Sequence, residues 1–176
     1  MNTRTILVSC AAIVIGTVVP TLAQQQVSSQ FDKTYDFSKI KTFTAQIASS
    51  WGNPIGEKNV LEKIQQALIA KGWAKADQGK ADAAVMIHGA TETRRQLNAM
   101  YGGGGWRFGG MGTITESTYT VGTLILDIFD AGSKELLFRG TAEDQLATSA
   151  DKNEKKLDKA LEKMFRDFPP QAAKKK

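Results

Sequence analysis

Two stretches of the chain have the three- and four-residue spacing of apolar side chains that is typical of amphipathic helices. In the first, apolar residues recur from Val60 to Leu68, and Gly72 follows where a helix cap would lie. In the second, they recur between residues 157 and 168, and two prolines stop the pattern. The spacing predicts helices over residues 57–71 and 151–167.

Strands are indicated by β-branched and aromatic residues that alternate with polar ones or form unbroken apolar runs. Thr123–Phe129 is nearly unbroken, which is typical of a strand buried on both faces. Gln24–Gln30 is polar, and we expect it to be frayed. The pattern predicts two short strands within residues 31–47, separated by a turn at 36–39, and three longer strands over residues 81–96, 117–129 and 135–144.

This order of elements predicts an α+β fold. Helices and sheets bury their apolar faces against one another in layers. We therefore expect a two-layer sandwich, with two helices on one face of an about five-stranded, mixed or antiparallel sheet. The helix between the second and third strands favours a crossover, and hence a mixed sheet. Neither an internal repeat nor a linker is visible, so residues 24–170 are predicted to form a single domain.

The first 23 residues have the pattern of a signal peptide. Arg4 supplies a positive start, Ile6–Val19 is apolar and uncharged, and Pro20 ends that run before the small residue Ala23. We predict cleavage after Ala23 and an exported protein in the periplasm or associated with the outer membrane. An uncleaved membrane anchor is the alternative, although the apolar run is short for a membrane span.

Cys10 is the only cysteine of the chain. Residues 7–10, Leu-Val-Ser-Cys, fit the lipobox of bacterial lipoproteins, but most of the apolar run follows the cysteine instead of preceding it. Cys10 is therefore either a lipidation site or an ordinary signal-peptide residue. No cysteine follows it, so the exported chain has no disulfide, cysteine-based metal site or thiol nucleophile.

The charge pattern argues against a nucleic-acid-binding protein. After residue 23 there are 22 basic and 18 acidic side chains, and Lys174–Lys176 account for three of the basic ones. The domain is therefore nearly neutral and lacks the basic footprint that nucleic-acid binding requires. Residues 171–176 form a basic C-terminal tail, which either is solvated or makes peripheral contact with anionic lipid.

Gly102–Gly112 contains seven glycines among eleven residues. A phosphate-binding loop needs a lysine after its last glycine, and a dinucleotide-binding loop needs a helix there. The chain has no lysine between Lys80 and Lys134, and strand-like sequence follows the glycines, so we expect no cofactor. The segment is predicted to be a surface loop in which Trp106, Arg107 and Phe108 bind a partner, or in which the two aromatic rings fold back over the sheet.

A few polar residues within the strands are candidates for chemistry. His88 is the only histidine, which excludes a metal site of several histidines, and we expect it to be structural. Asp127 interrupts an apolar run, and we expect Arg139 to be its partner across the hairpin. Asp130 begins the turn to the next strand and is expected to accept hydrogen bonds from that turn's backbone.

Several segments together resemble the small bacterial envelope lipoproteins grouped as domain of unknown function 4136. The segments are "YDFSKIKTFT" (35–44), "LIAKGW" (68–73), "ADAAVMIHG" (81–89), "GTLILDIFDAGSKELLFRGTAED" (122–144) and "MFRDFPP" (164–170). The resemblance implies export to the Gram-negative envelope and an α+β fold. It implies no particular reaction and no catalytic residues. Members usually place the lipobox after the apolar segment, and this chain does not.

We therefore expect a non-enzymatic envelope or periplasmic module that binds a protein, a glycan or another envelope partner. The alternative is an envelope hydrolase or lyase in which His88 and Asp127 act as acid and base. A buried cleft that joins those two side chains would favour the enzyme. An exposed surface that includes Trp106 and Phe108 would favour the binding module.

Overall fold

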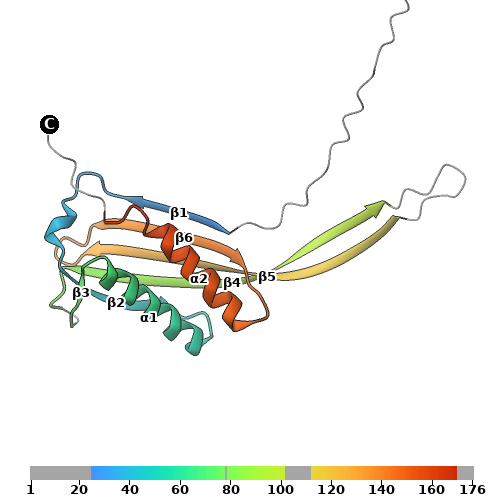
Figure 1. Ribbon diagram of the computed structural model, residues 1–176, viewed down its shortest axis with the longest axis horizontal. Coiled ribbons are helices and arrows are strands. Elements are labelled where there is room, and N and C mark those ends of the chain that lie inside the picture. The colour runs from blue at the N-terminus through green and yellow to red at the C-terminus, as the bar shows by residue number, and fades with distance from the viewer. Residues whose placement is uncertain (1–24, 78, 102–111, 170–176) are drawn as a thin grey trace, which may run out of the picture.

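Six strands form one mixed sheet, and two helices lie on the same face of it (Figure 1). The computed structural model describes residues 25–77, 79–101 and 112–169. The elements in chain order are β1 (Gln26–Phe31), a 3-10 helix (Phe37–Lys39), β2 (Thr42–Ser49), α1 (Pro54–Ala70), β3 (Ala74–Lys75), β4 (Ala83–Tyr101), β5 (Gly112–Asp130), β6 (Leu136–Gln145) and α2 (Ala150–Met164).

The strands are ordered β1-β6-β5-β4-β2-β3 across the sheet. β2 runs parallel to β3 and β4, and the pairs β4–β5, β5–β6 and β1–β6 are antiparallel. The expected α+β class and the mixed sheet are confirmed. The parallel pair arises because α1 carries the chain back across the sheet between β2 and β4, as a parallel connection requires.

The expected number of about five strands is too low, because a polar segment forms an edge strand. Gln26–Phe31 was expected to be largely frayed, but it pairs with β6 from Gln26↔Glu143 to Phe31↔Phe138. An edge strand needs only one neighbour and leaves its side chains in solvent, so it requires no apolar pattern. Residues 32–41 form a loop and the 3-10 helix instead of a strand, and the Asp36 carboxylate caps that helix by accepting from the Ser38 amide.

The two predicted helices exist, and each begins earlier than expected. α1 starts at Pro54 because Asn53 caps it, accepting a hydrogen bond from the Gly56 amide at 3.0 Å, and because proline is favoured in the first helical turn. α2 ends at Met164, short of the expected residue 167.

The core lies between the helices and the sheet. β4 contributes Val85 and Ile87, and β5 contributes Leu126 and Ile128, all completely buried. Aromatic rings fill the end of this core, where Phe168 lies 4.7 Å from Phe138 and 5.7 Å from Phe165, centre to centre. Leu161 and Phe165, the middle of the predicted α2 stripe, are both buried.

Candidate functional site

β4 and β5 extend well beyond the other strands as a two-stranded hairpin (Figure 1). Each strand has nineteen residues, paired from Ala83↔Asp130 to Tyr101↔Gly112. β2 pairs with β4 only as far as His88, and β6 pairs with β5 only as far as Val121. The remaining parts, Ala90–Tyr101 and Gly112–Thr120, are called here the projecting ribbon. At the usual rise per residue, the β4 part is about 40 Å long.

The sequence of the projecting ribbon favours an extended chain but offers little to bury. Threonines recur on both strands, and their β-branched side chains favour strand conformation. On β4, the described side chains from Thr91 to Leu97 are exposed apart from Arg94, and Leu97 retains 70% of its accessible surface. No described helix contributes to packing against this part of the hairpin, so its cross-strand hydrogen bonds and side-chain pairs hold it together.

Arg94 ties the base of the ribbon to the sheet. Its guanidinium donates to Glu143 of β6 at 2.7 Å and to Glu92 at 3.1 Å. The hydrogen bonds to Glu143 and Glu92 raise the pKa of Arg94 above its usual value. In the strand register this contact crosses Val121 of β5, which accordingly retains only 4% of its surface. The ion pair between Arg95 and Glu116 farther out is longer, 3.5 Å, and exposed, so it contributes little to stability.

Two glycines lie where the ribbon leaves the sheet. A β-carbon on Gly89 would come within 2.3 Å of the Trp51 indole, which therefore packs directly on the backbone of β4. A β-carbon on Gly122 would meet Leu146 at 2.8 Å. The Trp51 contact requires glycine because a ring held between backbone segments cannot move away as a leucine methyl group can.

The predicted partner-binding residues Trp106, Arg107 and Phe108 lie outside the described residues. They belong to the segment that joins Tyr101 of β4 to Gly112 of β5. The predicted strand boundaries were too short on this side. We expected strands to end at residue 96 and to restart at 117, whereas pairing continues to Tyr101↔Gly112.

His88 and Asp127 lie on the open face of the sheet, the face that the helices do not cover. His88 pairs with Ile125, and Asp127 pairs with Met86 on the same two strands, so the candidate acid and base occupy diagonal positions. Such diagonal neighbours are about 7–8 Å apart. The structure therefore brings these two residues near each other, as the enzymatic alternative requires.

Both residues nevertheless have other partners. Each carboxylate oxygen of Asp127 accepts a hydrogen bond from the Arg139 guanidinium at 2.6 Å, which confirms the predicted pair and raises the pKa of Arg139. His88 Nδ1 lies 2.9 Å from the Ser49 hydroxyl, a contact that sequence reasoning missed because the β2–β4 register is not visible locally. Asp130 accepts from the Gly132 and Ser133 amides at 2.8 Å, as predicted.

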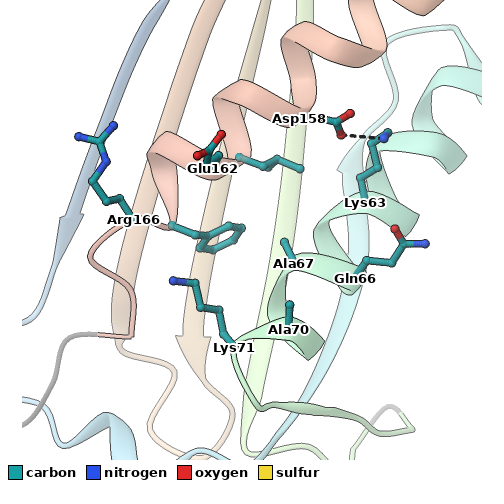
Figure 2. Close-up of a pocket in the computed structure, with 10 residues that line it drawn as sticks. Lys63, Gln66, Ala67, Ala70, Lys71, Asp158, Glu162 and Arg166 are labelled. Atoms are coloured by element: carbon teal, nitrogen blue, oxygen red, sulfur yellow. Dashed lines mark hydrogen bonds and ion pairs between the residues drawn. The ribbon is translucent and has the colours of Figure 1, made fainter.

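A shallow groove of about 510 Å³ separates the two helices on the other face (Figure 2). Its apolar lining comes from Ala67 and Ala70 of α1 and from Leu161 and Phe165 on the α2 side. At one end, Lys63 donates to Asp158 at 2.7 Å, and this hydrogen bond, with a second to Glu154, raises the pKa of Lys63. The other lining residues are Gln66, Lys71, Glu162 and Arg166. Both signs of charge line the groove, so it does not single out a ligand of one charge.

Within the described residues, no cluster of histidine, cysteine, aspartate and glutamate could hold a metal ion. Neither helix in this part of the chain is long and apolar enough to cross a membrane.

Comparison with solved structures shows the fold alone, because every identity is low. A PDZ domain protein from Parabacteroides distasonis matches with a TM-score of 0.56 and 16% identity over 84% of this chain. The chain spans 37% of that protein's length. The PelC dodecamer of Paraburkholderia phytofirmans matches with a TM-score of 0.45 and 14% identity, over 78% of this chain and 95% of PelC.

A putative neuraminyllactose-binding hemagglutinin homolog from Helicobacter pylori has a TM-score of 0.41 and 12% identity, over 81% of this chain and 94% of the homolog. Comparison with curated proteins finds no match. The family model described as a domain of unknown function, DUF4136, matches residues 27–170, which is nearly all of the described structure. The chain therefore belongs to the DUF4136 family.

Proposed function

We propose that this protein is a non-enzymatic, exported module of the bacterial envelope that binds a protein or glycan partner through its projecting ribbon. The observation that carries the proposal is the ribbon itself. A two-stranded hairpin is at best marginally stable in water, and the exposed side chains of this one bury little apolar surface. A protein that keeps so long an extension gains most from it when a second molecule packs against it.

The segment between the two ribbon strands supports the same proposal. Trp106, Arg107 and Phe108 are residue types that dominate binding surfaces, since they combine large apolar area with a charge or hydrogen-bond donor. Chain connectivity attaches them to the end of the ribbon that is farthest along β4 and β5 from the helices. Residues at the end of a long hairpin can reach a partner that the helix-covered part of the domain does not touch.

The contacts of His88 and Asp127 weigh against the enzymatic alternative. A general base must be available to take a proton, and both oxygens of Asp127 already accept from Arg139. A Ser49–His88 pair would need a third group to orient the imidazole, and Asp127 faces Arg139 instead. Binding is therefore the better-supported function.

Site-specific photocrosslinking in cells tests the proposal. A photoreactive residue at Thr115, which is exposed on the ribbon, is expected to trap a discrete envelope partner. The same residue at Ile55, 85% exposed at the start of α1, is the matched control. The double variant Trp106→Ser, Phe108→Ser should weaken capture at Thr115 with almost no change in melting temperature. Equal capture at both positions, or none at Thr115, would contradict the proposal.

Export is tested separately by intact-mass spectrometry of the protein isolated from the cell envelope. Cleavage after Ala23 predicts a mature chain that begins at Gln24. A diacylglycerol-modified Cys10 at the amino end would instead identify a lipoprotein.

A further inference from the structure

We propose that the outer edge of β4 in the projecting ribbon pairs with the same edge of a second copy of this chain. The inference uses the ribbon but does not depend on which envelope partner the protein binds. β2 stops pairing at His88, and from Ala90 to Tyr101 no other described strand lies beside this edge. About half of the N–H and C=O groups of a strand point to each side, so this edge presents a long row of backbone donors and acceptors.

A second copy is the occupant that fits this edge best. Every copy carries an edge of the same length and direction, and a two-fold axis perpendicular to the sheet brings two of them together antiparallel. The two ribbons then form a four-stranded sheet, which exceeds the three strands needed for independent stability. The pairing is also closed, since one β4 edge satisfies the other and no further copy is recruited.

β2 limits how far the two edges can slide past each other. If the axis lay at Thr93, Asn98 of the second copy would stand opposite His88, where Ser49 of β2 already pairs. The axis must therefore lie farther out along the ribbon. The same faces of the two sheets meet only when opposed residue numbers add to an even number, so the axis passes through a residue.

Charge then selects one register. The two axes that align nearly the whole edge pass through Arg95 or Gln96. The first places two Arg95 side chains directly opposite each other, and like charges in that position are destabilising. The second opposes two Gln96 amides, each of which both donates and accepts hydrogen bonds. In this register Arg95 faces Leu97 of the second copy, and no like charges meet.

Cysteine crosslinking of the full chain in a Cys10→Ser background tests this register. Opposed residues of an antiparallel pair have Cα atoms about 4.5–5.5 Å apart, within the range of a disulfide. Gln96→Cys is therefore expected to form a disulfide-linked dimer under mild oxidation, at least about ten times faster than Glu92→Cys. The Glu92 position is the matched control on the same face of β4, because its counterpart would lie about 27 Å away.

Sedimentation equilibrium supplies a second readout that needs no oxidation. Gln96→Lys places two ammonium groups at the axis and should weaken the dimer by about tenfold or more, with partial recovery at high salt. Thr115→Lys adds the same charge to β5 and should leave the dimer unchanged. A monomeric parent chain, or equal crosslinking of the two cysteine variants, would overturn the self-pairing. Neither result would affect capture of an envelope partner at Thr115, so the two proposals fail separately.

Discussion

The helix-covered part of the sheet and the projecting ribbon are built from the same two strands, but their side chains have opposite surroundings. In the first part, Val85 and Leu126 are completely buried beneath the helices. A few residues farther along β4, Thr91 and Leu97 are exposed. Because both parts share one continuous hydrogen-bonded register, backbone pairing alone does not account for the stability of the fold. Burial against the helices accounts for it in one part, and the other part is left for contact with a second molecule.

The largest expected effect is in the aromatic end of the core. Phe165→Ala should lower the free energy of unfolding by about 3–5 kcal/mol, because the ring is buried against Phe138 and Phe168 and its loss leaves a cavity. Leu97→Ala on the ribbon removes a comparable apolar side chain and should change stability by less than about 0.5 kcal/mol. Urea denaturation of both variants measures the contrast. Similar losses for the two variants would mean that the ribbon is packed as firmly as the core.

A smaller effect is expected where the two parts meet. Gly89→Ala forces a methyl group into the Trp51 indole and should cost about 1–3 kcal/mol. Gly122→Ala is the matched control at the same junction, since its methyl group meets the end of a flexible, partly exposed Leu146 side chain. Thermal melts should rank Gly89→Ala well below Gly122→Ala. The reverse order would show that the indole, not the leucine, can move aside.

A pH-dependent effect is expected at the end of the sheet opposite the ribbon. The Tyr35 hydroxyl donates to Asp130 at 2.5 Å, and burial together with this hydrogen bond raises the pKa of Tyr35 from 10.0 to about 12. The folded protein holds this proton more tightly than the unfolded chain. The stabilisation is therefore complete below about pH 10 and is lost as the pH rises toward about 12.

We expect the loss to be about 1 kcal/mol, because the side chain is only partly buried and solvent screens the interaction. Spectrophotometric titration should show one tyrosine that ionises near pH 12, and Tyr35→Phe should remove it. Tyr119, on the ribbon, is the control, and Tyr119→Phe should leave the late transition in place. If Tyr119→Phe removed it instead, the assignment to Tyr35 would be wrong.

The smallest effect on stability is expected from removing the outer ribbon. Joining Arg94 to Tyr119 through an Asn-Gly turn keeps the Arg94–Glu143 ion pair and deletes the rest. The free energy of unfolding should change by less than about 1 kcal/mol, because an unsupported hairpin adds little stability and loop length affects closure entropy slowly.

Hydrogen exchange of the intact chain sharpens the same comparison. Ribbon amides beyond Thr91 should exchange faster than amides of Val85–Ile87 in monomeric protein. Partner binding or self-pairing should slow the ribbon amides selectively. A truncated chain that fails to fold would contradict the view that the helix-covered part of the domain is self-sufficient.

The hairpin β5–β6 illustrates what could be predicted from the candidate site. The turn signal at Asp130 and the adjacent apolar runs set the register, and they correctly predicted the Asp127–Arg139 pair. The Ser49–His88 contact could not be predicted in the same way, because β2 and β4 are parallel and separated by a helix. Trp106, Arg107 and Phe108 remain predicted binding residues, which the crosslinking experiment addresses.

By itself, the sequence determined the two helices, the α+β class and the hairpin from β5 to β6, because apolar periodicity and turn residues act over a few positions along the chain. Only the tertiary structure decided that the polar segment Gln26–Phe31 is an edge strand, since its partner β6 is more than a hundred residues away. It also decided where β2 and β6 stop. Those two endpoints create the projecting ribbon, because a strand's neighbours depend on pairing between distant residues that no local pattern records.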